Sequence, residues 1–579
     1  MTMLTKWGAA LDRSCPLPEY PRPQLRRESF YNLNGVWDYA VTPSGDEPEV
    51  WDGEIVVPFS PEAPLSGAAR GPAKDEYLHY RRGFTLPEGF QKSRVLLHFG
   101  AVDQIAEVFV NGVSAAKHSG GYWPFSADIT SLLREGENIL RVTVRDNADD
   151  PTFAYGKQRY KRGGMWYTAQ SGIWQTVWLE SVPEVYVKSL RITPEFDEAR
   201  VRIELETALE SSAAITCDVR AADGSFVAGS WAKGGVCVVP LPGFRAWTPD
   251  DPYLYTLDIT CGEDRVESYF AMRKFSYVEL GGHKVFGLNN APLFHNGLLD
   301  QGYYPDGLLT PPSDEAMVND IETMKRCGFN MLRKHIKIEP LRWYYHCDRL
   351  GMIVWQDMVS GGQPYSFLHV SALPTLGKVD LPDQDAKPYG RSGVLSRARF
   401  RREMADTVRL LYNCPCIALW TVFNEGWGQF DALDMANELK KLDPTRFIDH
   451  ASGWQDQGYE EMKSRHIYFR PVKLKNDGRA LALTEYGGYI LAVDGHRWTD
   501  KVFGYRICRD SAALAHDYEK LMLGQVLPHI RKEGLTAAVY TQITDVEEEL
   551  NGLMTYDREV LKIPEETLRE INAALRFDA

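Results

Sequence analysis

The sequence predicts a multidomain β plus α/β protein: an N-terminal jelly-roll β-sandwich, an immunoglobulin-like β-sandwich and a C-terminal (β/α)8 TIM barrel. Its 579 residues suffice for three or four domains of roughly 150 residues. The first part consists of short β-type segments separated by turn residues, and from Lys274 onward helical segments alternate with short apolar strands. We place the domains at residues 1–183, 184–272 and 273–579.

The N-terminal region has the pattern of a jelly roll. The segments 95–99, 106–110 and 139–144 are short and rich in β-branched or aromatic residues. Turn signals such as Asn111-Gly112 separate them, which is typical of hairpins. Evenly spaced short strands of this kind predict a sandwich or jelly roll.

A second β region follows from about Tyr186. Polar and apolar residues alternate strictly over 201–206, and the region leaves through a turn-rich segment at 247–253. Its span to Met272 is about 90 residues, the size of an immunoglobulin-like sandwich.

The remaining residues predict alternating βα units. Helical periodicity is found at 314–327, 341–350, 397–411 and 430–442. Short apolar strands are expected at 330–333, 352–355, 417–420, 447–448, 466–468, 481–483 and 537–540. This number of repeats favours an eight-stranded barrel over an open sheet.

Composition excludes several classes of partner. Lys and Arg total 65 and Asp and Glu total 79, a net charge of −14 without a long basic run, so we expect neither nucleic acid nor an anionic membrane as a partner. No apolar run reaches the roughly 18–20 residues of a membrane span, and no secretory segment follows Met1. The nine cysteines lack paired metal-ligand spacing. We therefore expect reduced thiols, a cytoplasmic location and no metal. No nucleotide-binding glycine motif is present, so no cofactor is expected.

Two glutamates follow apolar strands of the predicted barrel, where a barrel places its reacting groups: Glu425 after 417–423, and Glu485 after 481–484. Each could instead be a solvated loop carboxylate or a first-turn helix charge. If they flank a glycosidic bond at about 5–5.5 Å, one protonates the leaving oxygen and the other attacks the anomeric carbon, with net retention.

Motifs along nearly the whole chain support this chemistry. In the first domain they are Leu33-Asn-Gly-Val-Trp37, Tyr80-Arg-Arg82, Phe109-Val-Asn-Gly112 and Ser171-Gly-Ile-Trp174, and in the barrel Leu332-Arg-Lys-His335, Asn424-Glu425 and Thr484-Glu-Tyr-Gly487. Together with the order sandwich, sandwich, barrel, they resemble glycoside hydrolase family 2, the group of β-galactosidases, β-glucuronidases and β-mannosidases.

The resemblance implies roles for four residues. Glu425 matches the general acid/base and Glu485 the nucleophile. Asn424 matches the residue that bonds the sugar 2-hydroxyl, and Tyr468 the tyrosine that orients the nucleophile, although it could equally be a core aromatic. These roles require surroundings that keep Glu425 protonated and Glu485 ionised.

Further positions match the family's substrate-binding residues. Arg333 and His335 belong to an Arg-x-x-His-like signature, where a guanidinium can hold the nucleophile ionised and an imidazole can bond a hydroxyl. Asp300 follows the first strand, where it could bind a sugar hydroxyl through its carboxylate or could instead cap a turn. Asp357 is expected as a brace at the barrel rim. Tyr540, together with Gln542, is expected to line the sugar pocket.

The expected function is a retaining exo-β-glycosidase acting on terminal β-linked sugars, with a galactoside first. The family's β-glucuronidases carry an Asn-x-Lys pair that this chain lacks, and the matching stretch 545–552 is acidic, which would repel a uronate. A β-uronidase would need another carboxylate clamp, for which Arg470, Lys473 and Lys475 are candidates. Mannosides, galacturonides and furanosides stay open.

The alternative from another class is a non-catalytic carbohydrate-binding protein. On either interpretation the expected partners are a carbohydrate and a second copy of the chain in a homo-oligomer.

Overall fold

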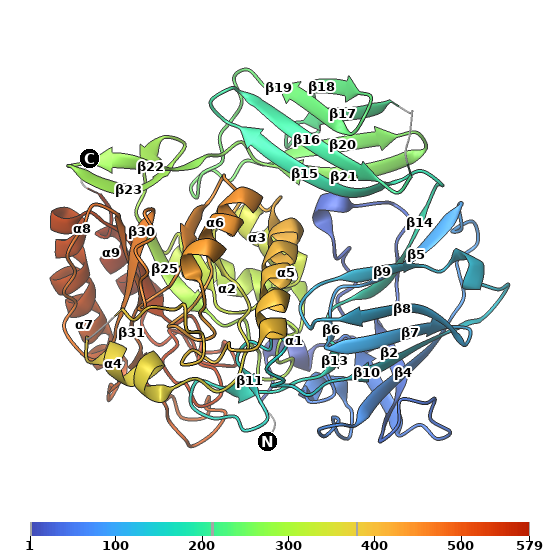
Figure 1. The fold of residues 1–579 in the computed structure, drawn as a ribbon, viewed down its shortest axis with the longest axis horizontal. Coiled ribbons are helices and arrows are strands. Elements are labelled where there is room, and N and C mark those ends of the chain that lie inside the picture. The colour runs from blue at the N-terminus through green and yellow to red at the C-terminus, as the bar shows by residue number, and fades with distance from the viewer. Residues whose placement is uncertain (1–2, 210–213, 378–379, 578–579) are drawn as a thin grey trace.

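The computed structural model describes residues 3–209, 214–377 and 380–577. Two antiparallel β-sandwiches precede a barrel of parallel strands, so the predicted fold class is confirmed. Figure 1 shows the N-terminal sandwich (blue) beside the barrel (yellow to red), with the second sandwich (green) above their junction. Among the described residues, no helix is long and apolar enough to cross a bilayer, and no cysteine forms a disulfide.

The first sandwich consists of a six-stranded and a four-stranded sheet. The strand order of the larger sheet is β3 (Gly53–Val57), β2 (Gly35–Thr42), β4 (Tyr77–Phe84), β10 (Asn138–Arg145), β7 (Ile105–Val110) and β8 (Val113–Ser119). The strand order of the smaller sheet is β1 (Tyr31–Asn32), β14 (Val177–Val182), β5 (Arg94–Phe99) and β9 (Phe125–Asp128). Alternate side chains, among them Trp37, Tyr80 and Val108, form the core between the sheets. The predicted Asn111-Gly112 turn joins β7 to β8 with both residues at positive φ.

Over its described residues, the second sandwich has seven strands in two sheets. They are β15 (Val187–Glu195), β16 (Arg200–Thr207) and β19 (Val236–Pro240), against β18 (Phe226–Ala232), β17 (Ile215–Arg220), β20 (Tyr255–Cys261) and β21 (Asp264–Phe270). In β16 the alternation predicted from sequence is realised, because Val201 and Ile203 are fully buried while Arg202 and Glu204 are partly exposed.

Eight parallel strands form the barrel, in chain order β25 (His295–Asp300), β26 (Met331–Lys334), β27 (Ile353–Asp357), β28 (Ile417–Thr421), β29 (Phe447–Asp449), β30 (Met462–Ile467), β31 (Ala480–Gly487) and β34 (Leu535–Thr541). The first strand pairs with the last, β25 with β34. β29 and β30 are neighbours, but no ladder joins them among the described residues.

Helices follow most of these strands. Those close to the predicted ranges are α2 (Asp314–Arg326), α3 (Leu341–Leu350), α5 (Val394–Leu411) and α6 (Ala432–Leu442), whereas α7 (Ser511–Leu521), α8 (Leu527–Glu533) and α9 (Glu565–Ala573) were not predicted. The fully described connections 450–461 and 468–479, on either side of β30, contain no helix. The first of them holds two glycines at positive φ, Gly453 and Gly458, which do not fit a helix.

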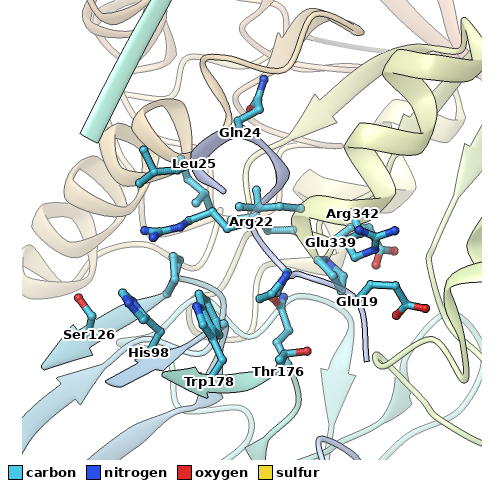
Figure 2. A pocket seen from close by; sticks show the side chains of 18 of the residues that line it. Glu19, Arg22, Gln24, Leu25, His98, Ser126, Thr176, Trp178, Glu339 and Arg342 are labelled. Carbon is cyan, nitrogen blue, oxygen red and sulfur yellow. The ribbon is translucent and has the colours of Figure 1, made fainter. Parts of the chain in front are cut away.

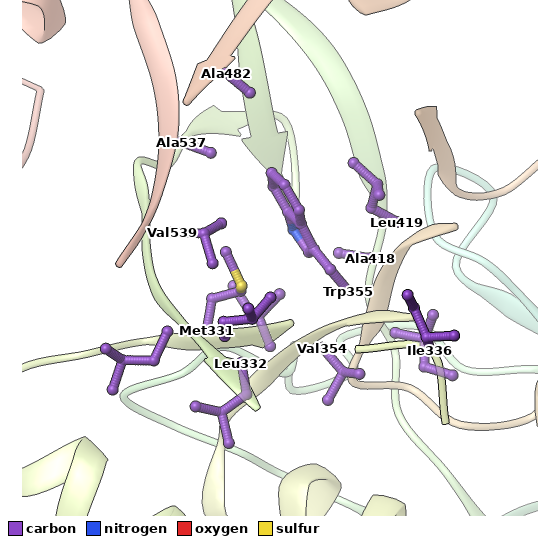
Figure 3. Packing of buried hydrophobic residues seen from close by; sticks show 14 of the residues in the cluster. Met331, Leu332, Ile336, Val354, Trp355, Ala418, Leu419, Ala482, Ala537 and Val539 are labelled. Carbon is purple, nitrogen blue, oxygen red and sulfur yellow. The ribbon is translucent and has the colours of Figure 1, made fainter. Parts of the chain in front are cut away.

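Large and small side chains together fill the barrel interior. Figure 3 shows Trp355 among Ala418, Ala482 and Ala537, where small residues leave room for the indole. A three-stranded sheet, β22 (Phe275–Leu280), β23 (His283–Leu288) and β24 (Ala291–Pro292), closes the N-terminal end. There Phe286 stacks on Phe447 with ring centroids 4.2 Å apart. The C-terminal strand ends therefore form the open end.

A cavity of about 270 Å³ lies where the N-terminal segment, both sandwiches and the barrel meet (Figure 2). Arg22, His98, Trp178 and Arg342 are among its lining residues, and His98 stacks on Trp178 with centroids 4.8 Å apart. Neither predicted catalytic glutamate lines it. The cavity belongs to the domain junction.

A buried arginine joins the two sandwiches. Arg27 donates to Glu180 of β14 at 2.9 Å and to both carboxylate oxygens of Asp264 of β21 at 3.0 and 2.9 Å. All three side chains are at most 3% exposed. Burial raises the pKa of Glu180, but the neighbouring Arg22, His98 and Arg27 outweigh burial and lower it. The carboxylate therefore stays ionised.

Replacing Arg27 by alanine should lower the free energy of unfolding by about 3–5 kcal/mol, because Asp264 then holds a buried charge without its partner. Arg26 is the matched control. Its side chain is 57% exposed and pairs with Glu267 at the surface, so Arg26→Ala should cost less than about 1 kcal/mol. Calorimetric melting of both variants measures the difference, and equal shifts in Tm would contradict this account.

Candidate active site

Most of the predicted site residues meet at the open end of the barrel. Asp300 ends β25, Arg333 lies on β26 and Asp357 ends β27. Glu425 follows β28, and Glu485 lies near the end of β31. Parallel strands bring their carboxyl ends to one rim, so residues far apart in the sequence form one site.

Arg333 binds three side chains from three other strands. Its guanidinium donates to both carboxylate oxygens of Asp357 at 3.0 Å, to Oε1 of Glu485 at 3.1 Å and to Oδ1 of Asn424 at 2.8 Å. The side chain is fully buried. Burial opposes its charge, but Asp357 and Glu485 outweigh that effect and raise the pKa of Arg333. A permanent cation thus lies beside Glu485.

Glu485 is surrounded by hydrogen-bond donors. Arg333 binds one carboxylate oxygen, and the Tyr468 hydroxyl donates to the other at 2.5 Å. Burial raises the pKa of Glu485, and His466, Arg333 and the Tyr468 hydrogen bond counteract the rise. These donors favour the ionised carboxylate. Tyr468 therefore lies against the predicted nucleophile.

Glu425 occupies a strained turn. Its φ is 54°, in the left-handed region that costs a non-glycine residue about 1–2 kcal/mol. Its N–H donates to the carbonyl of Ser452, and its carbonyl accepts from the Trp454 indole, both at 2.9 Å. The side chain is 22% exposed. Burial raises the pKa of Glu425 to about 7, although Lys157 and Arg333 lower it. A large fraction of this carboxyl is therefore protonated near neutral pH.

His466 lies between the two carboxylates. Its Nδ1 is 2.8 Å from Oε1 of Glu425 and 3.6 Å from Oε2 of Glu485. One oxygen of each glutamate and one ring nitrogen of His466 all lie within 4.8 Å of one another. Burial lowers the pKa of His466 to about 3, so the ring is neutral. A neutral imidazole nitrogen can donate to ionised Glu425 or accept from its protonated form. Gly453, at φ 93°, allows this position, since a Cβ there would lie 2.5 Å from the ring.

The same three side chains could hold a metal ion. Glu425, His466 and Glu485 form the group with suitable geometry among the described residues. Carboxylate and imidazole are ligand types that Zn²⁺ accepts. The expectation that the site uses no metal stays a prediction.

Asp300 and His335 also lie at the rim. Asp300 accepts from Lys334 Nζ at 2.7 Å and from the Gly302 N–H at 2.8 Å, which is a turn-capping contact. Nδ1 of His335 is 2.8 Å from Asp357, and burial lowers the pKa of His335 to about 3. With Nδ1–H donated to Asp357, Nε2 remains as an acceptor. Their contacts with a sugar stay predictions.

Tyr540 differs from the sequence-based expectation. It is fully buried, and its ring packs against Tyr486, Tyr489 and Tyr518 with centroids 5.2–6.3 Å apart. Tyr518 belongs to α7, so this side chain faces the outer helices and does not line a sugar pocket. Strand alternation explains the difference, because the neighbouring Val539 takes the barrel interior (Figure 3).

Four further candidates, Gln542, Arg470, Lys473 and Lys475, differ in where they lie. Gln542 is buried and bonds to Gln301 at 2.9 Å and Asn551 at 2.8 Å. Arg470 lines a pocket that contains Glu425, whereas Lys473 and Lys475 are exposed and are absent from its described lining.

A loop of the first sandwich, residues 157–168, reaches the barrel mouth. Glu547 accepts from Arg162 at 3.2 Å and from the Thr168 N–H at 2.8 Å, and the Tyr167 hydroxyl donates to Glu549. The acidic stretch 545–552 thus anchors this loop. Glu547 and Glu549 are engaged with the first sandwich, and the expectation that the charge of this stretch repels a uronate stays a prediction.

Lys157 is a site residue that the sequence analysis missed. It is 9% exposed, and its ammonium lies 5.8 Å from the centroid of the Trp166 ring. Its charge lowers the pKa of both Glu425 and Glu549, which places it near the site. No motif marks it. His466 was missed too, but its spacing of two from Tyr468 along a strand predicts a shared face.

Comparison with known proteins finds relatives along the chain. The family model described as "Glycosyl hydrolases family 2, sugar binding domain" matches residues 64–183, "Glycosyl hydrolases family 2" matches 185–273 and "Glycosyl hydrolases family 2, TIM barrel domain" matches 311–473. A β-galactosidase of Thermoanaerobacter pseudethanolicus is 25% identical, covering 63% of this chain and 47% of that protein. The chain thus spans about half the length of that relative.

Two further proteins match over more of their length. A β-glucuronidase of Paenibacillus borealis is 22% identical, covering 82% of this chain and 85% of that protein. The solved structure of a Dictyoglomus thermophilum β-D-glucuronidase has a TM-score of 0.73 at 19% identity, covering 96% of this chain and 99% of that one, a likeness of fold. The three family models match more than half of the chain, in the order found here. The chain therefore belongs to glycoside hydrolase family 2.

Proposed function

We propose that the protein is a retaining exo-β-glycosidase that hydrolyses terminal β-linked sugars. One observation carries the proposal: oxygens of Glu425 and Glu485 lie within 4.8 Å of each other at one barrel rim. This separation is close to the roughly 5–5.5 Å of retaining enzymes and shorter than the roughly 6.5–9.5 Å that accommodates an inverting enzyme's water.

Hydrolysis takes place in two steps, formation and breakdown of a glycosyl-enzyme, and each glutamate has its own role in them. Glu425 gives its proton to the glycosidic oxygen while Glu485 attacks the anomeric carbon, so the bond to the leaving group breaks and a glycosyl-enzyme forms. Ionised Glu425 then takes a proton from water, which attacks the anomeric carbon and releases Glu485. His466 can bond to Glu425 in both protonation states.

Arg333 orients Asn424 for the sugar. Oδ1 of Asn424 accepts from the guanidinium, which leaves its amide N–H groups for the 2-hydroxyl. Such a bond strengthens as positive charge develops on the ring in the transition state. The loop 157–168 at the barrel mouth favours a terminal sugar over an internal one.

For the glycone we propose a neutral β-hexoside, with a galactoside first. Relatives bear the names β-galactosidase and β-glucuronidase, so a second candidate deserves a test. A β-uronide is favoured by Lys157, whose ammonium lies 5.8 Å from the centroid of the Trp166 ring and whose charge lowers the pKa of Glu425. An ammonium of this kind can bind a sugar carboxylate.

Glu485→Gln should lower kcat for an aryl β-glycoside by several orders of magnitude, because the nucleophile is removed. Glu519→Gln on the exposed face of α7 is the control and should stay within about twofold. A 2-fluoro sugar should label Glu485, and NMR should show retention. Turnover of Glu485→Gln within a few fold of the parent, or an inverted first product, would refute the mechanism. Sugar binding without turnover in the parent would support the carbohydrate-binding alternative.

The rate should fall on the alkaline side near neutrality. Glu425 must be protonated to act, and its pKa is raised to about 7, so kcat/KM should decrease as the pH rises through about 7. Lys157→Met removes a cation that lowers this pKa, so the decrease of kcat/KM should move to higher pH. Lys161→Met, exposed on the same loop, should leave it in place. If kcat/KM of Lys157→Met decreased over the same pH range as that of the parent, the assignment of this pH dependence to Glu425 would be contradicted.

A panel of glycosides with one aglycone separates the two glycones. If the substrate is a uronide, Lys157→Met should reduce kcat/KM for the glucuronide or galacturonide by about 10–100-fold, the effect of losing a charged hydrogen bond. The kcat/KM for the neutral galactoside, measured at the pH optimum of each variant, should decrease much less. A parent that prefers the galactoside, with no selective effect of Lys157→Met on uronides, would eliminate the uronide candidate.

A further inference from the structure

An apolar pocket of about 540 Å³ adjoins Glu425. Its walls include Met165 from the loop of the first sandwich, together with Phe367, Leu376, Trp454, Phe469 and Phe503 from the barrel. Glu425 lines this pocket, while Glu485 is absent from its described lining. The pocket therefore opens on the side of the proposed acid.

Polar groups in this pocket are few. The ionisable side chains of its lining are Glu425, His466, Tyr468, Arg470 and Tyr505. His466 and Tyr468 already bond to the two glutamates, and Tyr505 stacks on Tyr468 with centroids 3.9 Å apart. A second sugar would need several hydrogen-bond partners for its hydroxyls, and this lining offers few that are not engaged.

Large apolar side chains are exposed around the mouth. Phe367 is 72% exposed, Leu376 70% and Phe469 68%. Leu368 and Val502, next in sequence to lining residues, are 54% and 43% exposed. A clustered exposed apolar surface usually marks a binding site. The adjacent catalytic carboxyl indicates what binds here.

We propose that this pocket is the aglycone subsite and that it selects a flat aromatic leaving group over a second sugar. The inference rests on the proposed function, because the acid that protonates the leaving oxygen must face the leaving group. Phe367, Trp454, Phe469 and Phe503 supply aromatic surfaces that bury an aromatic ring favourably. The guanidinium of Arg470 adds a planar group that stacks on such rings.

The test compares aglycones of similar acidity on the preferred glycone, so that leaving-group chemistry is constant. The glycoside of 2-(naphthalen-2-yl)ethanol should have a kcat/KM at least about tenfold above that of 2-(2-methoxyethoxy)ethanol, the effect of burying the ring. The double variant Phe367→Ser/Phe469→Ser should remove most of this preference. Phe226→Ser, which alters a phenylalanine 61% exposed on the second sandwich, should leave it unchanged.

Binding of the free naphthyl alcohol, measured by calorimetry, separates the subsite from the reaction. We expect binding to the parent and to Glu485→Gln, and loss of binding in the double phenylalanine variant. Hydrolysis without a preference for the aromatic aglycone, or binding that survives the double variant, would overturn the subsite. A third outcome is that the parent hydrolyses neither glycoside but still binds the naphthyl alcohol, and that the double variant does not bind it. This outcome would overturn the proposed reaction and leave the pocket as an aromatic binding site.

Discussion

The buried guanidinium of Arg333 is the interaction on which the site depends. It joins Asp357, Asn424 and Glu485, which come from three other strand ends. A buried charge of this kind is tolerated only when it is paired, and the pairing is mutual. Burial raises the pKa of Asp357, but Arg333 and His335 outweigh it and lower the pKa to about 2. Loss of the guanidinium would leave two buried carboxylates, Asp357 and Glu485, without the cation that both of them pair with.

The two glutamates differ because their surroundings differ. Glu485 receives hydrogen bonds from Arg333 and Tyr468, whereas Glu425 is bonded to a neutral histidine and held in a strained turn. The first environment stabilises negative charge and the second is compatible with a protonated acid. Two identical side chains, with one oxygen of each within 4.8 Å of the other, can thus take opposite roles.

The first sandwich is part of this site. The acidic stretch 545–552 of the barrel binds the loop 157–168 through Glu547 and Glu549. That loop supplies Lys157, which acts on the pKa of Glu425, and Met165, which lines the apolar pocket. Neither domain alone contains the complete set of groups around the acid.

Periodicity in the sequence was sufficient to predict the two sandwiches, most of the barrel strands and four of its helices, because alternation and helical spacing are local properties. No predicted range covered β25, and the predicted range 466–468 reached only the end of β30. Motifs at strand ends located the glutamates, Asn424, Arg333 and Tyr468. Tyr540 was misplaced because adjacent strand residues face opposite sides, and an apolar segment does not tell which side is inside.

What the sequence alone determined is therefore which residues stand at the strand ends. Only the tertiary structure decided that His466 bonds to Glu425, that the charge of Lys157 acts on the same carboxyl, that Glu547 and Glu549 bind the first sandwich, and that apolar rings surround the pocket beside the acid. The physical reason is that ion pairing, burial and pKa depend on distance through space, and sequence separation carries no information about that distance.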